Sequence, residues 1–311
     1  MSEPIYTIPP IEYGPTADAL PAENEFNWGM LWPGVAALRA LTDGAGVAVG
    51  GIDTGIDRNH PLLKHCKDAA DFTGSRHGPD DRHGHGSHIS GSIGASDPRI
   101  GVAPGADLYH GKGLGDQGAG SGQAITGAMK WCAARGCEVL SMSLGSPGAD
   151  PEITGLMREL AQQGIWIIAA AGNSGPNTPD VDWPGRSPHC ISVAALNQDL
   201  SPANFSSAGA KIDTSGPGVG IWSCRPGGGF QQMSGTSMAC PYVAGVLTLY
   251  RAALKKAGRP VPKIGELRAL LFGDSMDVYT PGDDRRSGPG AISSLLLSLD
   301  LAPDPSPVRR P

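Results

Sequence analysis

Three glycine-flanked segments carry side chains that could perform acyl transfer together. In chain order they present the carboxylate of Asp53, the imidazole of His85 and the hydroxyl of Ser237. A serine hydroxyl is a weak nucleophile at neutral pH, so it needs a base that takes its proton and a carboxylate that orients the base. The sequence therefore predicts Ser237 as the nucleophile, His85 as the general acid and base, and Asp53 as the orienting carboxylate.

These segments resemble the motifs of the subtilisin-like serine proteases, which present their triad in the same order, Asp, His and Ser. The likeness is closest in character to the bacterial intracellular members of that family. It implies a serine endopeptidase that hydrolyses peptide bonds through an acyl-enzyme on Ser237. A peptide ligase would use the same acyl-enzyme, so ligation stays open as an alternative.

The segment 169–175 resembles the family's oxyanion-hole segment. The resemblance implies that the side-chain amide of Asn173 and the backbone N–H of Ser237 donate hydrogen bonds to the oxygen that becomes negative during attack. The alternative is a simple turn at Asn173, because glycines stand close to it at positions 172 and 175.

The resemblance also implies that the substrate binds as an added strand between two backbone segments, with a third segment lining the same cleft. The residues assigned to this cleft are Gly120, Ser121, Gly122, Ser143, Leu144, Gly145, Ala170, Ala171 and Gly172. Ala124 and Gly127 stand where relatives often carry larger side chains, which predicts an open and weakly selective fourth subsite.

Asp182 precedes Trp183 and Pro184 in a segment that resembles the one closing the S1 pocket. This pocket holds the side chain of P1, the residue whose carbonyl is attacked. A carboxylate at its floor predicts a preference for Lys or Arg at P1, because a buried charge needs a partner of opposite sign. The alternative is that Asp182 faces solvent in a loop.

Other hydrolase classes account for less of the sequence. None of the histidines follows Ser237, which excludes the order found in α/β-hydrolases. A metallohydrolase that uses His83, His85 and His88 is the alternative from another class, because their spacing approaches that of a metal-binding motif. That alternative leaves the segments of Ser237 and Asn173 unexplained.

The predicted chemistry needs no cofactor. The family's usual high-affinity calcium site is expected to be absent, because residues 60–63 offer leucine at the aspartate position and the loop 95–100 is short and carries a basic residue. Structural calcium bound elsewhere, by Asp80, Asp81 or Asp180, stays open.

Short apolar runs alternate with longer helical segments from about residue 46 onward. Such runs are typical of strands buried on both faces, and they occur at 47–52, 137–142, 165–170 and 190–195. The segments 121–135 and 151–163 are long enough for crossover helices, and glycine follows each. The sequence thus predicts an α/β fold, a three-layer sandwich with a mainly parallel central sheet and helices on both faces.

The chain is expected to divide into an arm at 1–25, a subtilisin-like catalytic domain at 26–275, and an extension with a Pro-rich, poorly ordered tail at 276–311. Residues 5–10 of the arm resemble the inhibitory extension of intracellular subtilisins. An arm that packs on the surface without effect is the alternative.

Charge and composition exclude several partners. The net charge is -6, and no run of more than two basic residues occurs, which argues against nucleic acid. No apolar run reaches the length of a membrane span, and the first residues lack the pattern of a signal peptide.

Polypeptide substrates in the cytoplasm are expected, with secretion the alternative if a signal peptide has been removed. The oligomeric state is not predicted, and the six cysteines are expected to be free thiols.

Overall fold

A parallel seven-stranded sheet forms the centre of the computed structural model, which describes residues 4–19, 27–293 and 295. Its strand order is β10-β9-β8-β7-β3-β5-β4, and every neighbouring pair runs parallel. The strands are β3 (Ala48–Asp53), β4 (Asp68–Asp71), β5 (Asp107–Lys112), β7 (Val139–Met142), β8 (Trp166–Ala170), β9 (Ile191–Leu196) and β10 (Thr214–Pro217). The predicted parallel α/β sheet is confirmed.

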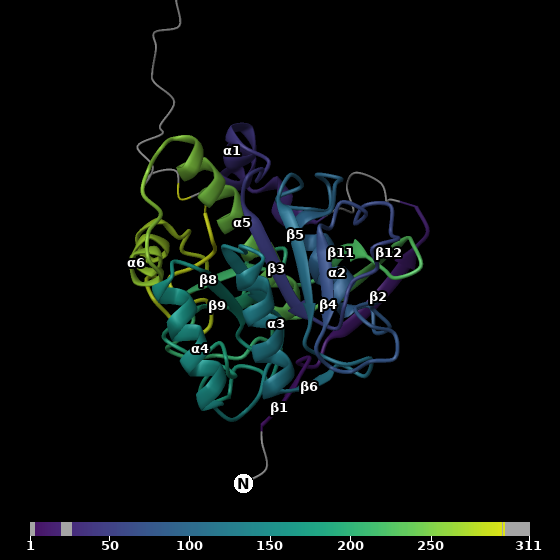
Figure 1. The fold of residues 1–311 in the computed structure, drawn as a ribbon. Coiled ribbons are helices and arrows are strands. Elements are labelled where there is room, and N and C mark those ends of the chain that lie inside the picture. Colours follow the sequence, from purple (N-terminus) through teal and green to yellow (C-terminus); the bar gives the residue numbers. More distant parts are fainter. Residues whose placement is uncertain (1–3, 20–26, 294, 296–311) are drawn as a thin grey trace, which may run out of the picture.

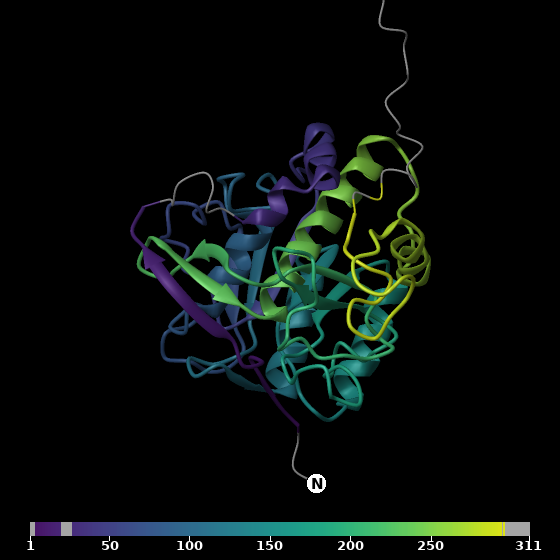
Figure 2. The ribbon, with the colours of Figure 1, turned by 180° about the vertical axis from the view of Figure 1, so that it is seen from behind.

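Helices cover both faces of this sheet. They are α1 (Pro33–Leu41), α2 (His85–Gly94), α3 (Gly122–Ala134), α4 (Pro151–Gln162), α5 (Thr236–Lys256) and α6 (Ile264–Asp274), with a short 3-10 helix η2 (Trp28–Leu31). Figure 1 shows α3 and α4 in front of the sheet, and Figure 2 shows α5, in green, on the opposite side. One apolar cluster joins Ile52 to Met129 and Leu156 on the α3–α4 face, and another joins Val49 to Ile89 on the α2 side.

The crossover helices begin and end where the sequence indicates. Asp150 accepts hydrogen bonds from the backbone N–H groups of Glu152 and Ile153, which caps the N-terminus of α4. Beyond the C-termini of α3 and α4, Gly136 and Gly164 adopt φ of 81° and 85°. Side chains other than glycine rarely adopt this left-handed conformation, so both glycines stop their helices.

The N-terminal arm is more regular than its Pro-rich sequence suggests. Strand β1 (Ile5–Thr7) pairs antiparallel with β6 (Ala119–Ser121), and β2 (Glu12–Ala17) pairs antiparallel with β12 (Phe230–Ser234). Strand β12 in turn pairs with β11 (Ile221–Cys224). These short strands form only because distant parts of the chain provide their hydrogen-bonding edges.

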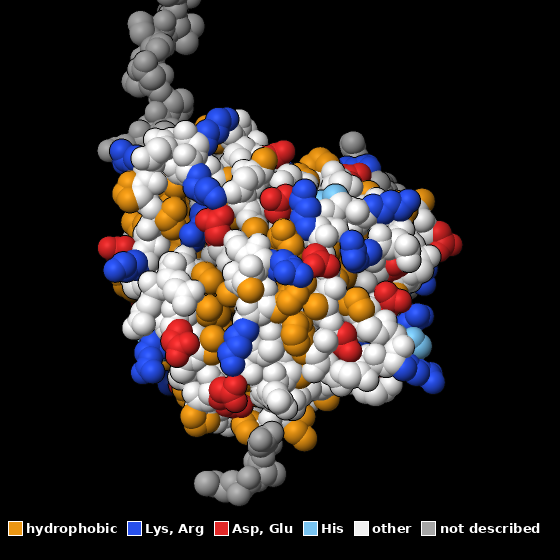
Figure 3. All heavy atoms as spheres, viewed as in Figure 1, with side chains coloured by type: hydrophobic (Ala, Val, Ile, Leu, Met, Phe, Trp, Pro, Cys, Tyr) orange, Lys and Arg blue, Asp and Glu red, His pale blue; other side chains and the backbone are white. Residues whose placement is uncertain are grey.

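Several smaller expectations can be compared with the fold. All six cysteines are buried free thiols, as predicted. Lys, Arg, Asp and Glu side chains are interspersed on the face seen in Figure 3. Within the described part of the chain, no helix is both long and apolar enough to cross a bilayer. The predicted disordered tail lies outside the described residues.

Candidate active site

Asp53 and His85 form a buried pair at the carboxyl end of the central sheet. Asp53 is the last residue of β3, and His85 is the first residue of α2. His85 Nδ1 lies 2.7 Å from Asp53 Oδ1, which also accepts a hydrogen bond from Thr54 N at 2.8 Å. Donation from Nδ1–H leaves Nε2 of His85 as the proton acceptor. The imidazole therefore has the orientation that a general base requires.

Glycine allows the helix that carries His85 to begin directly against the strand that carries Asp53. Gly84 precedes the helix with φ of 100°, a backbone conformation that suits glycine. A Cβ on Gly86 would lie 2.1 Å from the carbonyl oxygen of Gly55. Any larger residue at position 86 would push α2 away from the Asp53 turn and lengthen the Asp53–His85 contact.

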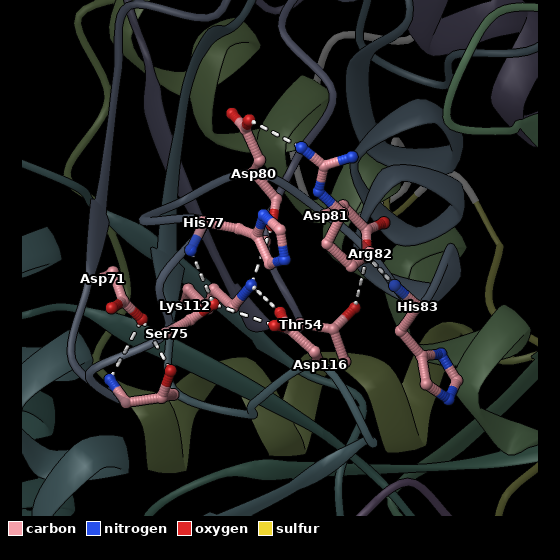
Figure 4. A network of polar contacts seen from close by, with 12 residues as sticks. Thr54, Asp71, Ser75, His77, Asp80, Asp81, Arg82, His83, Lys112 and Asp116 are labelled. Atoms are coloured by element: carbon pink, nitrogen blue, oxygen red, sulfur yellow. Dashed lines mark hydrogen bonds and ion pairs between the residues drawn. The ribbon is translucent and has the colours of Figure 1, made fainter.

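Asp81 and Thr54 connect the two catalytic segments. The Asp81 carboxylate accepts hydrogen bonds from Thr54 Oγ1 (3.0 Å) and from the backbone N–H groups of Gly84 and Ser87 (both 2.8 Å). Thr54 Oγ1 accepts from the backbone N–H of Gly86 at 2.9 Å. Figure 4 shows Asp81 between Thr54 and the His83 segment. The residues on either side of the Asp53–His85 pair are thus fixed to each other.

A buried lysine holds the backbone next to Asp81 in place. Lys112 is fully buried, and its Nζ donates to the carbonyl oxygen of Asp80 (2.7 Å) and to Asp116 Oδ1 (2.6 Å). Figure 4 shows the ammonium group directed toward the Asp80 turn. The Lys112 charge is paired, as a buried ammonium must be. Sequence reasoning named Asp81 only as a possible calcium ligand, and it missed Lys112, whose contact with Asp80 spans 32 positions of the chain.

His110 lies behind the Asp53 turn and is fully buried. Its Nε2 accepts a hydrogen bond from the backbone N–H of Gly55 at 3.2 Å, and its Nδ1 lies 2.9 Å from Ser90 Oγ. Burial lowers the pKa of His110 to about 4. A neutral ring therefore holds the turn after Asp53 in place.

Ser237 lies at the beginning of α5, three residues after the end of β12. Its Oγ donates to the carbonyl oxygen of Ser143 at 3.5 Å, and Ser143 Oγ donates to the carbonyl oxygen of Ser237 at 3.0 Å. Nε2 of His85 is buried and has no hydrogen-bond partner among the residues described. Catalytic hydrogen bonds are often loose before a productive substrate is bound.

Asn173 is oriented by Thr236, the residue before the nucleophile. Its Oδ1 accepts hydrogen bonds from Thr236 N (2.9 Å) and Thr236 Oγ1 (2.8 Å). Its Nδ2 is thereby directed into the cleft, where it donates to the carbonyl oxygen of Pro10 at 2.7 Å. An amide held this way is a preorganised donor for a carbonyl oxygen. Thr236 belongs to the same small-residue segment as Ser237, so the sequence carried a signal for it.

The arm lies between the two backbone segments expected to bind substrate. Thr7 and Gly145 exchange both backbone hydrogen bonds, at 3.0 and 2.8 Å. Ile8 N donates to the carbonyl oxygen of Gly118 at 3.1 Å, and Tyr6 pairs with Gly120. The arm thus completes a three-stranded arrangement, with its own chain in the position of an extended peptide.

Tyr6 fills an apolar pocket beside this cleft. The side chain is 1% exposed and belongs to the same cluster as Leu114, Ile125 and Leu144. A Cβ on Gly127 would lie 2.8 Å from Phe72 Cδ1, so Gly127 faces Phe72, and the open fourth subsite stays a prediction. Ile5, the preceding residue of the arm, is 66% exposed.

Asp182 is half-buried against two of the cleft segments. A Cβ on Gly172 would lie 2.3 Å from Asp182 Oδ2, and a Cβ on Gly145 would lie 3.2 Å from it. Burial raises the pKa of Asp182, and the nearby Arg186 partly offsets this effect. The carboxylate therefore lies between the segments 143–145 and 170–172, which also contain Leu144, Ala170 and Ala171.

The three clustered histidines do not converge on one point. Nδ1 of His85 is directed to Asp53, and Nε2 of His88 lies 3.0 Å from the carbonyl oxygen of Ile221. The ring of His83 stands edge-on to that of His85, with centroids 6.3 Å apart. Among the described residues, no group of three or more His, Cys, Asp or Glu side chains could hold a metal ion. The metallohydrolase alternative therefore loses its structural basis.

Comparison with known proteins agrees with this geometry. A sequence model of the subtilase family matches residues 44–290, most of the chain. The chain belongs to the subtilase family. It is 38% identical to M-protease of Shouchella clausii over 216 residues, which cover 68% of this chain and 56% of that protein. It is also 38% identical to subtilisin Savinase of Lederbergia lenta, of which 78% is covered.

Subtilisin E of Bacillus subtilis shows 39% identity over 212 residues, 66% of this chain and 55% of that relative. The chain thus spans a little over half the length of M-protease and of subtilisin E. The subtilase family is identified by an Asp-His-Ser triad. In this chain Asp53 and His85 form a buried pair, and Ser237 lies at the beginning of α5.

Proposed function

We propose that this subtilase is a serine endopeptidase with Ser237 as its nucleophile. The observation that carries the proposal is the 2.7 Å contact between His85 and Asp53, together with the Asn173 amide that already donates to a peptide carbonyl in the cleft. A base with a fixed tautomer and a preorganised oxyanion donor are the two features that acyl transfer to serine needs.

The reaction follows from these positions. As Ser237 Oγ bonds to the substrate carbonyl carbon, its proton moves to Nε2 of His85, and Asn173 Nδ2 donates to the resulting oxyanion. Collapse of this intermediate breaks the C–N bond, and His85 gives the proton to the leaving amine. Water then attacks the Ser237 ester by the same steps. An amine in place of water would give ligation, and no contact in the cleft favours that outcome.

Asp182 supports a preference for Lys or Arg at P1. Its carboxylate is half-buried between Gly145 and Gly172, and no hydrogen bond from the part of the chain that the structure describes ends on its side chain. A cationic P1 side chain would supply the missing partner. The P1 specificity of the enzyme would then differ from that of a protease with an uncharged pocket.

The arm supports an inhibited resting state. Asp53, His85 and Ser237 are all fully buried, and the arm contacts the cleft on both sides of them. Pro9 and Pro10 lack backbone N–H groups, and no residue of the chain before Arg39 is basic. An arm of this kind binds as a peptide would, yet it offers the Asp182 pocket no matching P1 side chain.

The arm is also the feature that this chain shares in character with bacterial intracellular subtilisins. On that basis we assign the protein to this group, with a cytoplasmic location as the corresponding expectation.

Digestion of a diverse peptide library, with cleavage sites identified by mass spectrometry, tests the proposed endopeptidase function. Cleavage by the unmodified chain that is absent for Ser237→Ala supports it, and cleavage that persists in the variant contradicts it.

A further inference from the structure

Strand β12 offers a backbone edge to the second strand of the arm. Strand β2 of the arm pairs with it antiparallel, from Glu12 opposite Ser234 to Ala17 opposite Phe230. The side chains of residues 12–16 are all exposed. The arm is therefore held on β12 through its backbone, a mode of binding that accepts many sequences.

The direction of the arm indicates which part of a bound substrate would pair with the edge of β12. Strand β1 precedes the carbonyl of Pro10 that Asn173 holds, and β2 follows it. Residues after the held carbonyl correspond to the leaving-group side of a cleaved peptide. Ala17, at the end of β2, is the seventh residue after Pro10.

Strand β12 is rigidly connected to the catalytic groups. It ends at Ser234, three residues before Ser237. Its partner β11 is fixed to α2, because Ser223 Oγ donates to the carbonyl oxygen of His88 at 2.7 Å and His88 Nε2 lies 3.0 Å from the carbonyl oxygen of Ile221. A strand bound to β12 is thus positioned relative to both the nucleophile and the helix of its base.

The arm itself fits this edge imperfectly. The register shifts between Gln231 and Met233, so the Gly14–Pro15 pair of the arm lies opposite the single residue Gln232. A Cβ on Gly14 would lie 2.8 Å from Gln232 Oε1, and Pro15 has no N–H to donate. A regular strand can make ladder hydrogen bonds that the arm lacks, so a substrate can compete for the edge.

We propose that β12 binds the leaving-group side of polypeptide substrates as an added antiparallel strand that extends about seven residues beyond the cleaved bond. The proposal rests on the proposed function, in which the arm occupies the position of a substrate. It names the substrate class as extended, unfolded polypeptide with a long segment after the cleavage site. Short peptides and compact proteins lack such a segment.

The test uses the full-length chain with three substitutions, Tyr6→Ala, Thr7→Pro and Tyr13→Pro, called the open-arm variant. These remove the buried ring of β1, one of its hydrogen bonds to Gly145, and the regular backbone of β2. Two peptides share all residues before the cleaved bond and carry three or nine residues after it. We expect KM to be at least ~10-fold lower for the longer peptide at similar kcat, because several ladder hydrogen bonds at roughly 0.5–1.5 kcal/mol each are added.

N-methylation of the longer peptide, one residue at a time, separates backbone pairing from other effects. In an antiparallel strand only alternate N–H groups face the partner. Methylation at the fourth to seventh residues after the cleaved bond should therefore raise KM at every second position. A second long peptide with these residues in scrambled order is the control, and its KM should be unchanged.

Equal KM for the two lengths, or a flat methylation profile, would overturn the proposal. Failure of the proposed function gives a different result, since the short peptide would then not be cleaved, or would still be cleaved after Ser237→Ala. In the unmodified chain the long peptide must also displace β2 from β12, so the same comparison should show an equal or smaller effect of length. A length effect there that is larger than in the open-arm variant also contradicts the proposal.

Discussion

The side-chain amide of Asn173 donates a hydrogen bond to the carbonyl oxygen of Pro10 at 2.7 Å. The amide that we propose as the oxyanion donor is therefore occupied by the protein's own arm. At the same time Ser237 Oγ is directed to the carbonyl oxygen of Ser143, and Nε2 of His85 lacks a partner among the described residues. In this state the arm's carbonyl oxygen is hydrogen-bonded to Asn173, but Ser237 Oγ does not yet donate to His85 Nε2. The arm is therefore bound in the cleft without being positioned for attack.

Removal of the Asn173 amide should lower kcat far more than it changes KM. In the open-arm variant, we expect Asn173→Ala to reduce kcat by ~10²–10³-fold, the loss known for the equivalent donor in subtilisin. Thr236→Val, which removes only the hydroxyl that orients the amide, should cost about 10-fold or less. Steady-state kinetics on one peptide measure both, and a rise in KM at constant kcat would contradict the assignment.

Asp182→Asn should remove the preference for a basic P1 residue. The measurement is the ratio of kcat/KM for two peptides that differ only in Arg or Leu at P1. In the open-arm variant this ratio should fall as the pH is lowered into the acid range, because protonation removes the Asp182 charge. Burial raises the pKa of this carboxyl, so the fall should begin at higher pH than for an exposed aspartate.

In Asp182→Asn the same ratio should be small and independent of pH over that range. A ratio that stays high in this variant would place the determinant of P1 specificity elsewhere.

Calcium removal should leave the protein folded and active. Asp81 is saturated by donors from Thr54 and the start of α2, and Asp80 and Asp180 pair with Arg82 and Arg186 at 3.5 Å. These carboxylates are therefore engaged by the protein's own donors. The melting temperature of Ser237→Ala should be the same in chelator and in millimolar calcium, and a clear rise with calcium would reveal a site.

His110 should make the fold sensitive to acid. Its pKa is about 4 in the folded protein, whereas an unfolded histidine titrates near 6.5. Between these values the unfolded state binds the proton and the folded state does not, so the free energy of unfolding falls as pH falls through this window.

Urea unfolding of Ser237→Ala across this pH range measures the slope, and His110→Gln should reduce it. Buried His88, whose pKa burial lowers to about 3, leaves a residual slope of the same sign. An unchanged slope in His110→Gln would mean that this ring does not titrate on unfolding.

The main elements of the fold could be predicted because their signals are local. The run 165–170 is apolar throughout and becomes β8, and Gly164 ends α4 just before it. The triad was accessible for the same reason, since each member lies in its own short motif. The family resemblance then suggested an oxyanion role for Asn173, which stays a prediction.

The remaining features depend on contacts between distant segments. Nothing in the neighbourhood of Lys112 indicates that its ammonium meets the carbonyl of Asp80, 32 residues earlier. The strands of the arm likewise require the edges of β6 and β12, which lie more than 100 residues away in the chain. The sequence analysis predicted no strand in this arm, because local propensity does not include a partner strand.

The central claim is that the arm covers a catalytic Ser237, and the rate of reaction with a serine-directed fluorophosphonate tests it most directly. Tyr6→Ala with Thr7→Pro removes the contacts of β1, while Ile5→Ala changes an exposed side chain of the same strand and is the matched control. The account predicts labelling of Ser237 at least ~10-fold faster in the double variant, since loss of a buried aromatic ring costs roughly 3–5 kcal/mol. It also predicts an unchanged rate in Ile5→Ala and no labelling in Ser237→Ala. Equal rates in the double variant and the unmodified chain, or labelling at another residue, would contradict it.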